Sequence, residues 1–301
     1  MKKSISALFF CCTFMSLVVT AENVFFIRLN IDENCIELGE FNNVLQKEVK
    51  EILPANEEFD LSVKRFEKYL ENKISPDEPA SILFFLHAMW GSNNWFVKSQ
   101  VIDFSESYIH DPENPIDYVF YILWDTKAIT YEANKNNSLQ SSALLNRLFS
   151  ILYAINPDDN YNYNLMCHCM GNKIFFDLLE SEHYEKRLFD HVILAAPDIN
   201  KDKLTGEQLL KNLEVISGKC HILYNKNDGL LMLSSIRNFY KPLGLHPDIS
   251  IAEKHSNIEF INCSFLTDNN RFPSSVTGHL YYSTSIATKR KIKSILSSQV
   301  Y

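Results

Sequence analysis

The most reactive group that the sequence offers is a cysteine between an apolar segment and a helical segment. Residues 163–176 read Tyr-Asn-Leu-Met-Cys-His-Cys-Met-Gly-Asn-Lys-Ile-Phe-Phe, which predicts a buried strand, a tight turn and a helix. Cys169 stands at the centre of the turn, and the small residues Cys167 and Gly171 lie two positions to either side. A strained turn exposes its central side chain, and small neighbours avoid clashes with its backbone. We therefore predict that Cys169 is a nucleophile, at a position where serine is more usual.

Two residues further along the chain are candidates to complete a catalytic site. A thiol nucleophile needs a base that accepts its proton and a third group that orients the base. Asp228 follows the apolar segment that ends at Tyr224, and His279 follows the last apolar segment. Asp198 competes with Asp228 because it also follows an apolar segment, but the acid of such a triad more often comes from the penultimate strand. We predict that His279 is the base and that Asp228 orients it.

A loop after the first long apolar segment is the candidate for oxyanion binding. Residues 87–92 read His-Ala-Met-Trp-Gly-Ser and directly follow the apolar run at 81–86. A backbone amide of this loop could donate a hydrogen bond to the oxyanion of a reacting carbonyl, and we predict that the amide of Met170 is the second donor. Taken alone, the loop is also consistent with a plain connection between a strand and a helix, with His87 as a buried structural residue.

Apolar and helical segments alternate along most of the chain. Continuous apolar runs are typical of strands that are buried on both faces of a parallel sheet. The predicted strands are residues 23–30, 81–86, 118–123, 164–167, 191–196, 220–224 and 257–262. The predicted helices are residues 142–155, 172–182 and 280–296, with one or two amphipathic helices in the charged stretch 40–73, interrupted at Pro54. The alternation predicts an α/β fold, a doubly wound and mostly parallel sheet with helices on both faces and the site at the carboxyl ends of its strands.

The composition is that of one large core with an acidic balance. The chain has 301 residues, of which 46% are hydrophobic, and its formal net charge is −8. A negative balance argues against a nucleic-acid partner, because phosphate binding needs a positive surface. We divide the chain into a signal peptide (1–21), an N-terminal strand and helices packed on the core (22–80), and a catalytic domain (81–301).

The first 21 residues have the pattern of an export signal. Lys2 and Lys3 precede an apolar run at 5–19, and Val19 and Ala21 place small side chains at the −3 and −1 positions of a cleavage site. The run is shorter than the ~20 apolar residues that a membrane-spanning helix needs, and an uncleaved membrane anchor is the alternative. We expect an exported protein that is periplasmic or secreted.

The mature chain would keep five cysteines. An odd number leaves at least one thiol unpaired in an oxidising compartment, and the other four could pair in three ways or not at all. The run Cys167-His168-Cys169 could begin a metal site, but Cys220-His221 is a weak second pair of ligands. We predict no metal and no cofactor. The five positions are Cys35, Cys167, Cys169, Cys220 and Cys263.

Four segments resemble those of a known family. The segment Leu-Met-Cys-His-Cys-Met-Gly-Asn is similar to the His-Ser-Met-Gly-Asn elbow of a bacterial branch of the α/β-hydrolases, which is esterase- and lipase-like and largely of unknown function. The four motifs occur in the expected order and span roughly residues 82–282, so together they are far more specific than any one of them. The matching segments are residues 165–172, 194–199, 224–228 and 278–282.

The resemblance implies a role for each of the site residues. It implies that Cys169 stands where the family has its nucleophilic serine, with Asp228 as the acid and His279 as the base. It also implies that Met89 supplies an oxyanion amide and that Trp124 lines the site.

The chain departs from the family pattern at three positions. Ala88 replaces a glycine that adopts positive φ freely. Asp125 replaces a proline in the turn after the preceding strand. Cys169 replaces the serine, but dienelactone hydrolases, which share the fold, work with cysteine. An adjacent imidazole and a helix N-terminus would both lower the pKa of this thiol.

These features predict a hydrolase that cleaves a carboxylic ester or thioester through an acyl-cysteine intermediate. We expect its pocket to include His87, Trp90 and Trp124, and its partners to be a small ester or acyl substrate, with association with a membrane or the cell envelope left open. The alternative is a catalytically degenerate hydrolase fold that acts as a binding or interaction module at the cell envelope, with Trp95 also at the rim.

Overall fold

A computed structural model describes most of the chain after the predicted leader. The described residues are 23–41, 46–74, 80–88, 108–109, 115–124, 126, 131–156, 160–265 and 278–298. The predicted signal peptide at 1–21 lies outside these residues, as do Met89, Trp90, Trp95 and Asp125.

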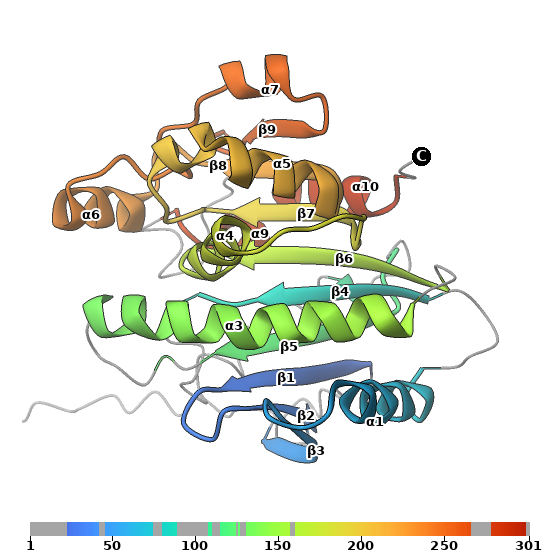
Figure 1. Ribbon diagram of the computed structural model, residues 1–301. Coiled ribbons are helices and arrows are strands. Elements are labelled where there is room, and N and C mark those ends of the chain that lie inside the picture. The colour runs from blue at the N-terminus through green and yellow to red at the C-terminus, as the bar shows by residue number, and fades with distance from the viewer. Residues whose placement is uncertain are drawn as a thin grey trace, which may run out of the picture.

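The described strands form one nine-stranded sheet (Figure 1). It is mostly parallel, as the sequence predicts, although the sequence predicts only seven of the strands. The strand order is β3-β2-β1-β5-β4-β6-β7-β8-β9. Each pair of neighbours in the part of the sheet that runs β1-β5-β4-β6-β7-β8-β9 is parallel. The strand β2 pairs antiparallel with both β1 and β3. The bounds are β1 Val24–Asn30, β2 Cys35–Phe41, β3 Lys47–Pro54, β4 Ala80–Leu86, β5 Tyr118–Trp124, β6 Tyr161–His168, β7 Phe189–Ala195, β8 Ser217–Tyr224 and β9 Ile258–Asn262.

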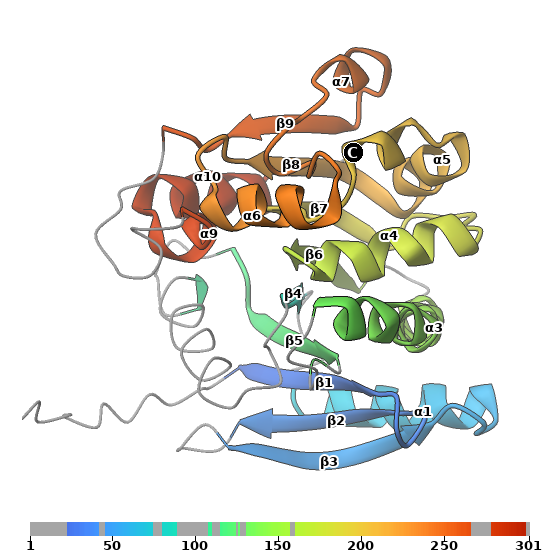
Figure 2. The ribbon, with the colours of Figure 1, turned by 90° about the vertical axis from the view of Figure 1, so that its left-hand side faces the viewer.

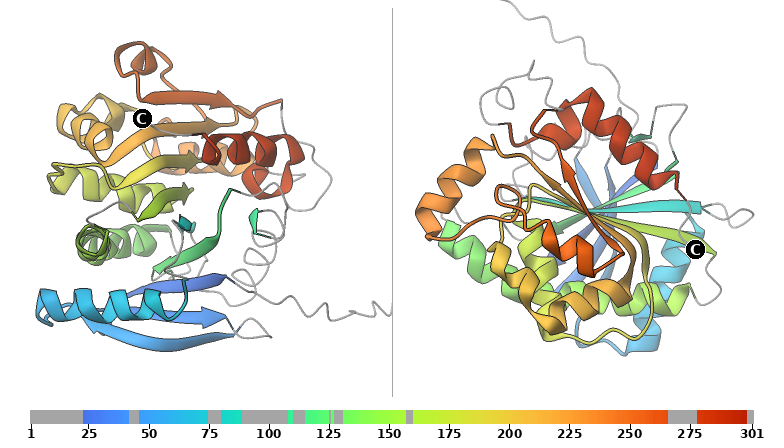
Figure 3. Two further views of the ribbon diagram at one scale, coloured as in Figure 1. Left: turned by 90° about the vertical axis from the view of Figure 1, so that its right-hand side faces the viewer. Right: turned by 90° about the horizontal axis from the view of Figure 1, so that it is seen from above.

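Helices cover both faces of this sheet. The helices α1, α3, α4 and α5 pack on one face, and α9 and α10 pack on the other (Figure 2). Each face therefore has its own buried apolar cluster, and the sheet twists between the two layers (Figure 3). No described helix is both long enough and apolar enough to cross a membrane. The helices are α1 Phe59–Glu71, α3 Tyr131–Ile155, α4 Gly171–Ser181, η1 Lys201–Thr205, α5 Glu207–Ile216, α6 Gly229–Asn238, α7 Ser250–Lys254, α9 Tyr281–Thr284 and α10 Ile286–Leu296.

The charged stretch at 40–73 is not wholly helical, so that prediction is wrong for its first half. Residues 47–54 form the edge strand β3, and only 59–71 form a helix. Lysine and glutamate alternate along β3 and are exposed or partly exposed there, as is typical of a protected sheet edge. Pairing with β2 therefore overrides the weak helical propensity of these charged residues.

Two helix boundaries also differ from the prediction. The helix expected at 142–155 begins at Tyr131, because polar residues extend it beyond the apolar stripe that the sequence shows. The helix expected at 280–296 is divided at Ser285, whose hydroxyl accepts a hydrogen bond from the amide of Thr288 and caps α10. The first part, α9, brings the residues that follow His279 against the sheet.

Candidate active site

Cys169 occupies a strained turn between β6 and α4. Its φ is +50°, in the left-handed region that residues with a Cβ rarely adopt. Three hydrogen bonds hold its backbone: its amide donates to Ala195 O at 3.1 Å, and its carbonyl accepts from the amides of Asn172 and Asp198 at 3.2 and 3.3 Å. The Asn172 side chain adds a bond to the same carbonyl at 3.0 Å. The surrounding structure thus fixes a conformation that the residue would otherwise avoid.

The small residues on either side of Cys169 are required by close packing. A Cβ at Gly171 would lie 2.4 Å from Leu86 O and 2.7 Å from His87 O. Cys167 is fully buried in β6, opposite Leu86 of β4 and Leu194 of β7. The elbow can approach the end of β4 only because position 171 has no side chain.

Asp228 and His279 are bound to each other at the carboxyl end of β8. The Nδ1–H of His279 donates to Asp228 Oδ2 at 2.7 Å. The other carboxylate oxygen, Oδ1, accepts from the amides of Leu230 and Leu231 at 3.0 Å each and caps α6. Both residues are buried, so their mutual orientation is fixed from two sides.

Asn225 and Tyr281 join the loop of the acid to the loop of the base. Asn225 Nδ2 donates to Gly278 O at 2.8 Å, directly before His279. Gly278 has a φ of +60°, and a Cβ there would lie 3.0 Å from that amide. The Tyr281 hydroxyl donates to Leu223 O in β8 at 2.8 Å and accepts from the Ala196 amide at 2.9 Å. These positioning roles are not among the predictions from the sequence, although an asparagine directly after a strand is a common turn signal.

Asp198, the competing acid, is engaged elsewhere. Its Oδ1 accepts from the hydroxyls of Ser234 and Tyr240 at 2.6 and 2.7 Å. Its backbone amide holds the carbonyl of Cys169. Asp198 therefore ties the elbow to α6, and it is Asp228 whose carboxylate binds the imidazole of His279.

His87 and Trp124 form a buried, hydrogen-bonded pair at the carboxyl ends of β4 and β5. The Trp124 amide donates to His87 Nε2 at 3.2 Å, its indole N–H donates to His87 O at 2.9 Å, and the two rings stack. Since Nε2 accepts, the proton of a neutral His87 is on Nδ1, which donates to Ala88 O. Burial lowers the pKa of His87 to about 4, so it is neutral near pH 7. Both side chains are almost fully buried, so they fix the carboxyl ends of β4 and β5 relative to each other.

The family of the chain follows from a comparison with known proteins. Residues 62–292 match the family model described as an alpha/beta hydrolase of unknown function (DUF900). The chain belongs to this α/β-hydrolase family. Comparisons with curated proteins and with solved structures gave no match. Family membership agrees with the sheet order and with the turn between β6 and α4.

The imidazole of this α/β-hydrolase interacts with the Cys169 side chain as well as with Asp228. The pKa of Cys169 is raised, because burial outweighs the opposing effect of His279. This corrects the expectation of a lowered pKa, since the lowering effect of the imidazole is smaller than the raising effect of burial. The hydrolase therefore holds a neutral thiol that needs a base, rather than a standing thiolate.

Opposing influences act on His279. Burial by itself lowers its pKa, but Asp228 and Cys169 together outweigh burial and raise the pKa well above its ordinary value. His168 packs against this ring with centroids 4.8 Å apart, and against Tyr282 at 4.5 Å. Burial holds the pKa of His168 well below its ordinary value, so its ring is neutral and is too weak a base to compete with His279 for a proton.

The pKa of His279 predicts how Cys169 reactivity depends on pH. A protonated His279 cannot accept the thiol proton, so the rate of iodoacetamide alkylation should fall as the pH drops through the raised pKa of His279. Asp228→Asn removes the raising influence of the carboxylate and should move this midpoint to lower pH. Mass spectrometry of Cys169 after timed labelling measures both midpoints, and a midpoint that stays in place or moves to higher pH would contradict the assignment.

The other cysteines of the described chain provide the matched controls for such labelling. All five are free, and Cys169 alone is partly exposed, while Cys35, Cys167, Cys220 and Cys263 are buried. No group of three or more metal-ligating side chains occurs among the residues that the structure describes. Burial also raises the pKa of Cys263 to about 12, so fast labelling identifies the elbow thiol specifically.

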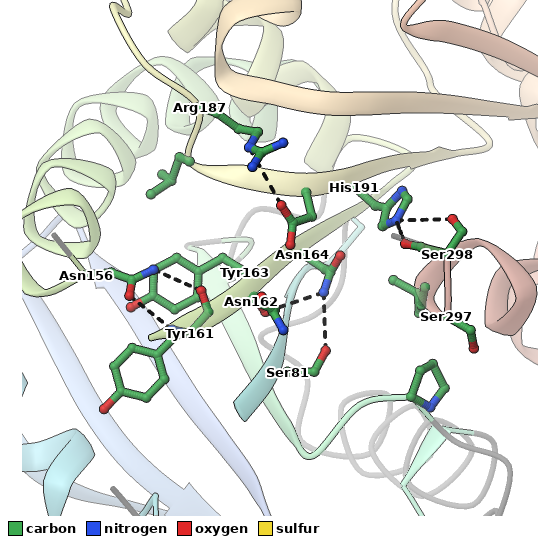
Figure 4. A pocket seen from close by; sticks show the side chains of 14 residues that line it. Ser81, Asn156, Tyr161, Asn162, Tyr163, Asn164, Arg187, His191, Ser297 and Ser298 are labelled. Atoms are coloured by element: carbon green, nitrogen blue, oxygen red, sulfur yellow. Dashed lines mark hydrogen bonds and ion pairs between the residues drawn. The ribbon is translucent and has the colours of Figure 1, made fainter. Parts of the chain in front are cut away.

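A separate polar cavity lies at the amino ends of the central strands, opposite the end that carries Cys169 (Figure 4). It has a volume of about 580 Å³, and Ser81, Tyr161 and Asp190 line it at the amino ends of β4, β6 and β7. Cys169 and Asp228 follow the carboxyl ends of their strands, so this cavity is not the pocket of the hydrolase site.

Proposed function

We propose that this α/β-hydrolase cleaves a carboxylic ester or thioester through an acyl-Cys169 intermediate. The observation that carries the proposal is the position of His279, which binds Asp228 and also interacts with a cysteine held at positive φ. That set provides a nucleophile, a base and a group that orients the base. The leader pattern at 1–21 supports action outside the cytoplasm, as a periplasmic or secreted enzyme.

In the first half of the reaction, the Cys169 sulfur attacks the carbonyl carbon while Nε2 of His279 takes the thiol proton. The carbonyl oxygen becomes an oxyanion, and the Met170 amide supports it because the first N–H groups of α4 have no partner within the helix. The amide of Met89 is expected to be the second donor. The tetrahedral intermediate then collapses, and the leaving alkoxide or thiolate takes the proton from His279.

In the second half, the acyl group is transferred to water. His279 removes a proton from a water molecule, which attacks the acyl carbon of the thioester. Collapse of this intermediate breaks the carbon–sulfur bond, the Cys169 sulfur regains a proton from His279, and a carboxylic acid leaves. Asp228 stabilises the imidazolium that forms in each half and keeps it oriented.

The test is a panel of activated esters and thioesters with acyl chains of graded length. The wild type should turn over at least one of them with a burst of acyl-enzyme, visible by mass spectrometry as an adduct on Cys169. Cys169→Ala should show neither, and Cys169→Ser reports whether the site also works with a hydroxyl. A wild-type rate no higher than that of Cys169→Ala across the panel would favour the degenerate binding module.

A further inference from the structure

Helix α6 exposes large apolar side chains on the same edge of the molecule as the candidate active site. Leu233 is 63% exposed and Ile236 is 72% exposed, and Met232 and the neighbouring Ile249 are also exposed. Among the residues of α6 only Leu231 is buried. The helix begins directly after Asp228 and lies across the carboxyl ends of the strands, where it faces the viewer in Figure 2. Such a patch on a soluble domain marks an interaction surface.

Phe239, which ends α6, shows that this surface is not explained by the fold. It has a φ of +54° and is 94% exposed. Helices usually place glycine or asparagine in this left-handed position, because a Cβ there is strained. An exposed phenyl ring adds no packing that would offset the strain. The residue therefore costs stability without benefit to the isolated molecule.

Lysines surround the apolar side chains. Lys201, Lys226 and Lys241 line a groove of about 760 Å³ together with Met232, Ile236 and Ile249. Lys201 lies 3.9 Å from Asp202, but no carboxylate in the described part of the chain forms an ion pair with Lys226 or Lys241. The Asp248 carboxylate, between the lining residues Pro247 and Ile249 in the chain, accepts a hydrogen bond from Ser250. This basic rim stands out in a chain with a net charge of −8.

We propose that α6, Phe239 and the lysine-lined groove form a surface that docks on an anionic lipid bilayer. Apolar side chains on one helix can enter the boundary between headgroups and acyl chains, while lysines bind anionic headgroups. A protein partner is less well matched, because the lining of the groove has none of the Trp, Tyr or Arg anchors that dominate protein interfaces, and Arg237 of α6 adds a further positive charge beside it. Docking does not depend on the ester chemistry, but it would place the end of the strands that carries Cys169 beside a lipid phase.

Co-sedimentation of the full chain with lipid vesicles tests the proposal. The wild type should bind vesicles that contain phosphatidylglycerol more strongly than pure phosphatidylcholine vesicles, and less strongly as salt increases. Ile236→Ser should weaken binding about tenfold through lost apolar burial, and Lys226→Glu combined with Lys241→Glu should remove the preference for anionic lipid. Leu139→Ser is the matched control, because Leu139 is 65% exposed on α3, away from this surface.

Phe239→Gly separates docking from folding. Glycine relieves the left-handed strain, so the melting temperature should rise while vesicle binding falls. Vesicle binding that is unchanged in both Ile236→Ser and Phe239→Gly would overturn the proposal. Any binding of the wild type would then come from another part of the chain, such as its apolar leader. Failure to bind vesicles, together with a dimer in sedimentation that Phe239→Gly dissociates, would assign the surface to a second copy of the chain instead. The same measurements in Cys169→Ala should match the wild type, because docking needs no turnover.

Discussion

Replacing Asp228 with asparagine is expected to lower kcat by about 10⁴-fold, the loss seen when a triad carboxylate becomes an amide. The amide cannot stabilise the imidazolium, and its NH₂ group would face the Nδ1–H of His279 and favour the wrong tautomer. The variant should still fold, because asparagine caps a helix as well as aspartate does and Oδ1 would still accept from Leu230 and Leu231. Steady-state kinetics on the best ester of the panel measures the loss.

Asp198→Asn is the matched control for this experiment. Asp198 accepts from Ser234 and Tyr240 and contributes its backbone amide to the elbow, so the change leaves the imidazole of His279 untouched. Its effect on kcat should be far smaller than that of Asp228→Asn. A larger loss in Asp198→Asn than in Asp228→Asn would transfer the role of triad acid to Asp198.

The parts of the fold and site that the sequence predicts are those set by local patterns. The turn at Cys169 can be predicted because the buried strand, the small residues and the helix that constrain Cys169 all lie within a few positions of it. The parallel strands can be predicted because they are buried on both faces of the sheet and therefore consist of continuous apolar runs. The order Cys169, Asp228, His279 then follows from the ends of those strands.

What the sequence could not show depends on residues that are distant in the chain. The edge strand β3 carries the charges of a helix surface, and only its pairing with β2 makes it a strand. The bond from Asn225 to Gly278 joins loops that are far apart in sequence. The direction of the Cys169 pKa shift depends on burial by several elements, which local proximity to a histidine and a helix terminus does not reveal.

Gly171 packs directly against the backbone at the end of β4, and Gly171→Ala should therefore be severely damaging. The new Cβ would lie 2.4 Å from Leu86 O and 2.7 Å from His87 O, and both are backbone atoms that cannot rotate away. Relief requires β4 and α4 to separate, which should cost about 3 kcal/mol of unfolding free energy. It would also shift the predicted oxyanion loop, so activity should fall even where the variant remains folded.

Denaturant unfolding of Gly171→Ala beside Gly206→Ala isolates this contact from the general effect of losing a glycine. Gly206 has an ordinary φ of −71°, and its nearest new contact would be at 3.2 Å, so that change should stay within about 1 kcal/mol of the wild type. Equal stability losses in the two variants would mean that β4 and α4 separate easily. The end of β4 would then not be held by the elbow, and the contacts between His87 and Trp124 alone would have to position it.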